Sequence, residues 1–257
     1  TRQYHCCSSS GFKRGYIEVK KISYSMLVHN EDKTLEKLLK FLVKWKHVDD
    51  EIVILDDYSD NEKTKQILDF YVSTYDIVFE QRNLLGDFAS QKNYLKNMCS
   101  GDYSFNLDAD EMISRWMIRN VHAIIDGNEG IDLIYLPRIN TVDGITEEHC
   151  RAYGYRLDEN GWVNFPDWQG RIFRNRPNIR WEKKVHERIT GYKTYATLPT
   201  DKPFLFISRA TAIASVSETL IKGPNSSRDN ISGTKLSPIP SILCDPSLLF
   251  SGNTGNA

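Results

Sequence analysis

Apolar and polar residues alternate along the chain in a pattern that predicts repeated strand–helix units in its first half. Continuous apolar runs, typical of strands buried on both faces, occupy 22–28, 51–55, 77–79 and 103–107. Between them, apolar residues recur at helical spacing over 35–43, 67–72 and 86–98, the last with Tyr94 and Leu95 on its apolar side. Strands that alternate with helices favour a parallel sheet with crossover helices, so we expect an α/β fold.

The second half of the sequence is less periodic. Its pattern predicts a helix over 116–125, a strand over 133–136 that ends at Pro137, and a loop-rich region over 138–170. Short strands are expected at 172–173 and 185–189. After 206, Ser, Asn, Gly and Pro predominate without periodicity. We therefore expect a disordered lead-in over 1–20, one domain over 21–205, and a low-order tail over 206–257.

Polar residues follow the ends of the four predicted strands of the first half. They are His29, Asn30 and Glu31, then Asp56 and Asp57, then Arg82, and finally Asp108 and Asp110. Right-handed crossovers bring the carboxyl ends of parallel strands to one edge of the sheet, where ligands bind in folds of this class.

Asp108 and Asp110 stand one residue apart in a predicted turn. Carboxylates in this arrangement are hard oxygen ligands suited to Mg²⁺ or Mn²⁺, and a cation held this way keeps positions for phosphate oxygens. A solvated acidic turn is the alternative for an isolated Asp-x-Asp.

Composition narrows the function classes. The chain of 257 residues has 33 basic and 34 acidic side chains, and this balance argues against bulk nucleic-acid binding. It lacks an apolar run of about 18 residues and the apolar core of a signal peptide, so neither a transmembrane helix nor secretion is expected. We expect a cytoplasmic chain, free or at the periphery of a membrane. Five irregularly spaced cysteines indicate neither a disulfide framework nor a zinc pair.

Several motifs in sequence order resemble a family-2 glycosyltransferase with the GT-A nucleotide-sugar-binding fold, over 22–190. They are Val28-His29-Asn30-Glu31, the strand ending in Asp56-Asp57, Phe88-Ala89-Ser90-Gln91-Lys92-Asn93, Leu107-Asp108-Ala109-Asp110-Glu111, Arg171-Ile172-Phe173-Arg174-Asn175, Trp181 and Val185-His186-Glu187. The resemblance implies a mostly parallel central sheet with helices on both faces. It also implies a nucleotide-sugar-binding half over 21–112 and an acceptor-side half over 113–205.

The resemblance further implies an inverting, metal-dependent transfer of a sugar from a nucleotide-sugar donor to a hydroxyl of a glycan, lipid or protein acceptor. The expected donor-binding residues are His29, Asn30, Glu31, Asp56, Asp57, Arg82, Lys92 and Asp108. The expected ligands of Mn²⁺ or Mg²⁺ are Asp108, Asp110 and His186. Inversion needs a general base near the acceptor hydroxyl, and Asp167 is the first candidate and Glu187 the second.

Some features leave alternatives open. Lys92 stands where relatives often carry arginine, which keeps the charge but loses the bidentate fork. Trp162, Phe165, Trp168 and Trp181 fit either a sugar-binding surface or a core.

Two other functions compete with glycosyl transfer. A nucleotidyltransferase would carry a glycine-rich basic loop after the first strand, and the acidic His29-Asn30-Glu31-Asp32 disfavours it. A non-catalytic nucleotide-sugar or glycan-binding module stays open, because the Ser-rich sequence after 206 replaces a helix that relatives often have.

Overall fold

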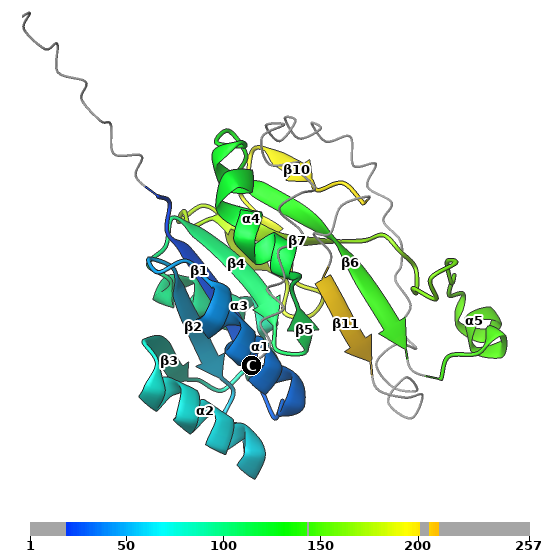
Figure 1. Ribbon diagram of the computed structural model, residues 1–257, viewed down its shortest axis with the longest axis horizontal. Coiled ribbons are helices and arrows are strands. Elements are labelled where there is room, and N and C mark those ends of the chain that lie inside the picture. Colours follow the sequence, from blue (N-terminus) through cyan, green and yellow to red (C-terminus); the bar gives the residue numbers. More distant parts are fainter. Residues whose placement is uncertain (1–18, 143, 201–205, 211–257) are drawn as a thin grey trace, which may run out of the picture.

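A nine-stranded sheet organises the computed structural model of the chain, which describes residues 19–142, 144–200 and 206–210 (Figure 1). The strand order is β3–β2–β1–β4–β7–β6–β11–β5, and β10 pairs with β6 beside this path. The strands of this sheet are β1 (Ile22–Val28), β2 (Glu51–Asp56), β3 (Ile77–Gln81), β4 (Tyr103–Asp108), β5 (Glu111–Met112), β6 (Leu133–Val142), β7 (Asp167–Arg174), β10 (Tyr195–Thr197) and β11 (Phe206–Ala210).

The predicted α/β architecture is confirmed. β1 pairs in parallel with β2 and β4, and β2 pairs in parallel with β3, so their carboxyl ends lie at one edge. β7 runs antiparallel to both β4 and β6 and thereby joins the two halves of the sheet. The helices are α1 (Lys33–Trp45), α2 (Glu62–Thr74), α3 (Phe88–Met98), α4 (Arg115–Asp126) and α5 (Glu147–Tyr153).

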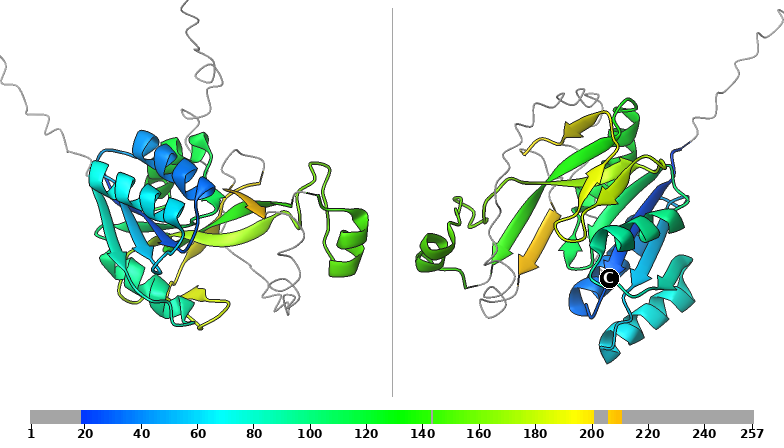
Figure 2. Two further views of the ribbon diagram at one scale, coloured as in Figure 1. Left: turned by 90° about the horizontal axis from the view of Figure 1, so that it is seen from below. Right: turned by 180° about the vertical axis from the view of Figure 1, so that it is seen from behind.

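Helices cover both faces of the sheet, which explains why the first strands are apolar at nearly every position. Ile52 and Ile54 of β2 belong to a core shared with α1, α2 and α4. The alternate residues Val53 and Leu55 pack on the other face, against Leu95 of α3. The two views of Figure 2 show α1 and α2 on one side of the sheet and α3 on the other.

Polar residues fix where the first helices begin. The side chains of Asn61 and Asp87 accept hydrogen bonds from backbone N–H groups in the first turns of α2 and α3. Ser114 does the same for α4. Such caps stabilise a helix by about 1 kcal/mol each because they satisfy donors that have no partner within the helix.

Glu51, at the start of β2, connects the amino ends of β1, β2 and β4 through its carboxylate. Its carboxylate accepts hydrogen bonds of 2.6 Å from the hydroxyls of Ser23 and Ser100, and lies 2.7 Å from Lys21 Nζ. Burial alone would raise the pKa of Glu51, but the hydrogen bonds from Lys21, Ser100 and Ser23 outweigh it and lower this pKa to about 2.

The prediction that a strand ends at Pro137 is wrong, because β6 continues through it to Val142. On one edge, β6 pairs with β10 over 133–135 and with β11 from Arg138 onward. Pro137 falls between these two partners, where the lack of a backbone N–H costs no ladder hydrogen bond on that edge.

The predicted strand at 185–189 is also wrong in its bounds. Residues 183–187 form the loop of an antiparallel hairpin between β8 (Arg180–Glu182) and β9 (Arg188–Thr190). Val185 in this loop is 59% exposed, so its apolar character gave a misleading signal of burial. Tyr94, predicted on the buried side of α3, is exposed and donates a hydrogen bond of 2.6 Å to Glu80.

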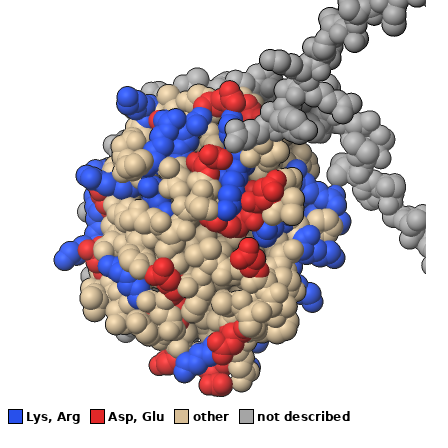
Figure 3. Space-filling view, turned by 90° about the vertical axis from the view of Figure 1, so that its left-hand side faces the viewer, with Lys and Arg blue, Asp and Glu red and all other residues tan. Residues whose placement is uncertain are grey.

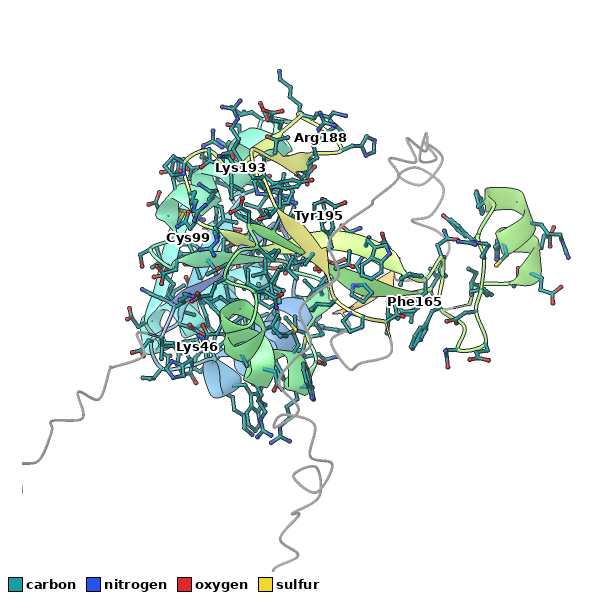
Figure 4. All side chains as sticks on the ribbon, turned by 90° about the horizontal axis from the view of Figure 1, so that it is seen from above. Lys46, Cys99, Phe165, Arg188, Lys193 and Tyr195 are labelled. Carbon is teal, nitrogen blue, oxygen red and sulfur yellow. The ribbon has the colours of Figure 1, made fainter. Side chains whose placement is uncertain are left out.

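The region 138–170 is more regular than predicted, since 138–142 belong to β6 and β7 begins at Asp167. Between them the chain leaves the sheet and forms a projecting arm that carries α5, a helix without buried residues (Figure 2, left). Figure 4 shows Phe165 at the base of this arm, far from Arg188 on the β8–β9 hairpin.

Some predictions concern residues at the chain ends. Residues 1–18 and 211–257, with Cys6, Cys7 and Cys244, lie outside the described residues. Within the predicted tail, Phe206–Ala210 forms β11 and pairs with β6 and β5. Every helix in the part of the chain that the structure describes is too short or too polar to cross a bilayer.

Candidate functional site

Two adjoining pockets lie at the carboxyl edge of the parallel strands. The first, here the edge pocket, is a cavity of about 330 Å³ whose polar lining is His29, Glu31, Asp57, Gln91, Lys92, Asp108, Asp110 and Glu187. The second, here the aromatic pocket, measures about 640 Å³ and is lined by Tyr135, Trp168, Trp181 and Tyr192 among others. Lys92, Asp108 and Glu187 line both pockets, so the two cavities meet at these three side chains.

Asp108, the last residue of β4, is held by a buried arginine from β7. Arg171 Nη2 donates hydrogen bonds to Asp108 Oδ2 at 2.6 Å and to Glu111 Oε1 at 2.5 Å, and its side chain is only 3% exposed. Burial would raise the pKa of Asp108, but the charges of Arg171 and Lys92 hold this pKa well below its usual range. Asp108 is therefore an anion whose charge is already balanced by the protein.

Lys92 is a buried link between the pockets rather than a surface lysine of α3. Its Nζ lies 2.6 Å from Glu187 Oε1 and 3.9 Å from Asp108 Oδ1. The same atom lies 4.5 Å from the centroid of the Trp181 ring, a cation–π distance. Lys92 thus joins Glu187, on the hairpin loop, to Asp108, at the end of β4.

Asp110 and Glu31 are carboxylates without an ion-pair contact among the described residues. Burial and the neighbouring charge of Asp108 raise the pKa of Asp110, and burial and the charge of Asp110 raise the pKa of Glu31. Among the ion pairs of residues 19–142, 144–200 and 206–210, none involves either carboxylate. Such a pair attracts a cation.

The donor set fits a hard divalent ion that is only partly coordinated by protein. No group of three His, Cys, Asp or Glu side chains within the described chain is arranged to hold a metal by itself. Mg²⁺ and Mn²⁺ sites often use one or two carboxylates and take the remaining ligands from substrate phosphates and water. Asp110, oriented into a pocket beside Asp108, suits that kind of site.

Asp56, the last residue of β2, and the adjacent Asp57 have different surroundings. Asp56 is buried, and its carboxylate accepts hydrogen bonds from Ser59 and Gln81, so it holds the loop. Asp57 lines the edge pocket, where Oδ1 accepts from Leu84 N at 2.7 Å and Oδ2 lies 3.7 Å from His29 Nδ1.

Three further predicted site residues lie outside both pockets. Asn30 bonds through its amide to the backbone of Asp60 and Asn61. Arg82 donates to Gln91 and Ser90 and borders a separate shallow groove on α3. His186 is exposed on the β8–β9 loop with a positive φ of 56°.

The two base candidates differ in their surroundings. Asp167 lines neither pocket, and its Oδ2 accepts hydrogen bonds from Arg138 at 2.7 and 3.0 Å and from Asn140 at 3.0 Å. Burial would raise the pKa of Asp167, but Arg138 and the amides lower it. Glu187 instead stands at the junction of the two pockets.

The aromatic residues divide in the same way. Trp168 and Trp181 line the aromatic pocket, whereas the rings of Trp162 and Phe165 pack on each other in the arm, with 4.9 Å between their centroids.

Tyr135 and Tyr192, whose hydroxyls lie 3.2 Å apart, were not predicted, and no sequence signal marks them. Arg171 could have been found as a site residue, because an arginine that enters an apolar strand needs a buried partner.

Solved structures with a similar fold share only low sequence identity with the chain. TarS 1-349 of S. aureus in complex with UDP-GlcNAc matches with a TM-score of 0.54 at 18% identity, over 77% of this chain and 61% of that chain. TarS 1-349 alone matches with 0.51 at 18% identity, over 74% and 60%. Full TarS matches with 0.50 at 17% identity, over 74% and 37%. The chain thus spans about 60% of the length of the first structures it matches.

Sequence comparison is more specific. No curated protein matches the chain. The sequence profile described as Glycosyl transferase family 2 matches residues 23–201, which include both pockets. This match covers well over half of the chain and agrees with the GT-A-like fold. The chain belongs to glycosyl transferase family 2.

Proposed function

We propose that the chain transfers a sugar from a nucleoside diphosphate sugar to an acceptor hydroxyl, with a divalent cation and with inversion at the anomeric carbon. The observation that carries this proposal is the junction of the edge and aromatic pockets at Lys92, Asp108 and Glu187. A donor in the edge pocket would present its anomeric carbon there, to an acceptor that lies in the aromatic pocket. Aromatic rings pack well on the apolar faces of sugar rings, which favours a glycan or glycosylated acceptor.

In this proposal the nucleoside lies against Asp57 and His29. The Asp57 carboxylate uses one oxygen for Leu84 N, so the other can accept a hydrogen bond from a ribose hydroxyl or a base N–H. TarS has been solved with UDP-GlcNAc, which makes this nucleotide sugar the first donor to test.

Asp110 is the proposed metal ligand. Asp108 is already paired with Arg171 and Lys92, whereas Asp110 has no cation in ion-pair contact among the described residues. A bound Mn²⁺ or Mg²⁺ would balance the charge that develops on the departing diphosphate. Lys92 would add a second positive charge at the same place. His186 would join the ligand set only through a movement of the hairpin loop, because it lines neither pocket.

Glu187 is the better placed of the two proposed bases. A general base must lie within hydrogen-bond reach of the acceptor hydroxyl, on the side opposite the leaving group. Glu187 is paired with Lys92 but lines both pockets, whereas Asp167 lines neither and is held by Arg138, Asn140 and Gln169. Asp167 would then act by holding Arg138 in place, and Arg138 in turn pairs with Glu111.

Metal-dependent donor turnover tests the proposal. We expect the parent chain to hydrolyse its nucleotide sugar slowly with Mn²⁺, and Asp110→Asn to lose roughly 100-fold of that rate, since removing a metal that stabilises the leaving group costs several kcal/mol. Asp69→Asn, an exposed site on α2, is the matched control and should keep the parent rate. Equal rates in the parent and Asp110→Asn would contradict the proposal. Metal-dependent binding without turnover would favour the non-catalytic module instead.

The donor can be identified by thermal shift. A ligand that binds the folded state raises the apparent melting temperature by mass action. We expect one nucleotide sugar to give a selective shift that requires Mn²⁺, and UDP-GlcNAc is the first of the panel.

A further inference from the structure

A cluster of cations surrounds Trp45 on the sheet face that α1 and α4 cover. Around its ring lie Arg115 Cζ at 3.9 Å, Arg119 Cζ at 4.6 Å and Lys44 Nζ at 5.2 Å from the centroid. Lys37 and Lys40 precede Lys44 by seven and four residues on α1, so the three lysines form one stripe along this helix. We call these six residues, Lys37, Lys40, Lys44, Trp45, Arg115 and Arg119, the Trp45 patch.

The cations of the Trp45 patch lack acidic partners. All five are exposed, and none of them takes part in an ion pair with any carboxylate of the described residues. Arg115 and Arg119 stand four residues apart on α4, a spacing at which like charges repel. On the side of the molecule that Figure 3 shows, basic and acidic side chains are interspersed.

Like charges at this spacing destabilise a helix modestly, a repulsion that an anionic partner would relieve. The net charge of the whole chain is −1, so the patch is a local asymmetry and not the result of a basic protein. A tryptophan with arginines and lysines around it is typical of the boundary between lipid headgroups and water. Val48, three residues beyond Trp45, adds an apolar side chain that is 83% exposed.

We infer that the Trp45 patch docks the protein onto a membrane surface that contains anionic lipid. The attachment is electrostatic, because the apolar residues of α1, Leu35, Leu38, Leu39 and Leu42, are buried in the core and cannot enter lipid. Trp45 and Val48 lie at headgroup depth. A soluble acidic partner would also match the charge of the patch, but it would not explain the exposed apolar side chain of Val48.

The docking geometry leaves the edge pocket accessible. Glu31 lines this pocket just before α1 begins, and Trp45, 14 residues after Glu31, ends the helix. At 1.5 Å per residue, Trp45 lies about 21 Å from Glu31 along α1, and Lys37, the patch residue nearest to Glu31 along the helix, lies about 9 Å from it. Lys46, beside Trp45, and Arg188, on the hairpin, lie on opposite sides of the molecule in Figure 4. Membrane binding and donor turnover are therefore separable.

Vesicle cosedimentation of the full chain tests the inference. We expect binding to vesicles of phosphatidylcholine mixed with an equal amount of phosphatidylglycerol, weakened by added NaCl, and none to phosphatidylcholine alone. Arg115→Gln with Arg119→Gln should lower the partition coefficient about 30-fold, because each cation near an anionic surface contributes roughly fivefold. Lys37→Gln with Lys40→Gln should have a similar effect and guards against a folding defect in the first pair.

The matched control removes two exposed arginines from the arm, Arg151→Gln with Arg156→Gln, and should bind vesicles like the parent. Donor hydrolysis without vesicles should be unchanged in all three variants, which separates this inference from the proposed function. Equal vesicle binding by parent and patch variants, binding to phosphatidylcholine alone, or no binding to either vesicle would overturn it.

Discussion

Arg171 is the residue whose replacement should reveal most about how the site is built. Its guanidinium lies between Asp108 and Glu111, and one nitrogen donates to both carboxylates. Glu111 is fully buried, with Arg138 Nη1 at 3.2 Å as its other cation. Arg171→Met would leave two acidic groups close together with a single nearby cation for each, Arg138 for Glu111 and the more distant Lys92 for Asp108.

The expected loss is large because the remaining charges are buried. Removing one partner of a buried ion pair typically costs 3–5 kcal/mol, and here one cation serves two anions. We therefore expect Arg171→Met to lower the free energy of unfolding by about 4 kcal/mol. Small domains are stable by only about 5–15 kcal/mol, so this variant would be marginal. Arg171→Lys keeps the charge, and its ammonium can donate to both carboxylates as Nη2 does in the parent, so its loss should be smaller.

Urea unfolding followed by circular dichroism measures these differences. The informative comparison is a double variant, Arg171→Met with Glu111→Gln, which removes one of the stranded carboxylates. It should recover about 1–3 kcal/mol relative to Arg171→Met, the usual size of coupling between groups in contact. A loss below about 1 kcal/mol in Arg171→Met, or a double variant no more stable than the single one, would refute this account of the buried network.

Three further changes test separate parts of the structure. Because the pKa of Glu51 is lowered in the folded state, its stabilisation is present above its ordinary value of 4.5 and is lost as the pH falls toward about 2. The stability difference between parent and Glu51→Gln in urea should therefore shrink between neutral and acidic pH, and a constant difference would contradict the assignment. Gly191 has a φ of +79°, and a Cβ there would lie 1.7 Å from a backbone oxygen. Gly191→Ala should cost about 3 kcal/mol in urea unfolding, whereas Gly130→Ala, with open space around it, should cost far less. Glu187→Gln should lower kcat of sugar transfer about 100-fold or more with little change in donor affinity, and Asp167→Asn should lower it less. The reverse order in a steady-state assay would assign the base to Asp167.

The sequence predicted the half of the sheet that contains β1 to β4 well because local pattern and burial agree there. The strands at 22–28, 51–55 and 103–107 are apolar on both faces, since helices cover both faces, and a parallel sheet then follows. The convergence of Asp57, Asp108 and Asp110 in one pocket required only that sheet and its right-handed connections.

The half of the sheet that contains β6 and β7 was less predictable because its order depends on long-range contacts. β6 runs through Pro137 only because its partners on one edge leave a gap there. The roles of Arg171 and Arg138 depend on pairing between β4, β7 and β6, which no local pattern encodes. Val185 looked like a buried strand residue, yet it lies on a hairpin loop whose position sets that of Glu187.

Calorimetric titration with the nucleotide sugar that the thermal-shift panel selects tests the central claim most directly, namely that the edge pocket binds a donor diphosphate with a cation at Asp110. The parent chain should bind the donor at least tenfold more tightly with Mn²⁺ than without it, a difference of about 1.4 kcal/mol. In Asp110→Asn the two affinities should be equal. Donor binding that ignores Mn²⁺ in the parent, or that keeps its full Mn²⁺ dependence in Asp110→Asn, would contradict the account.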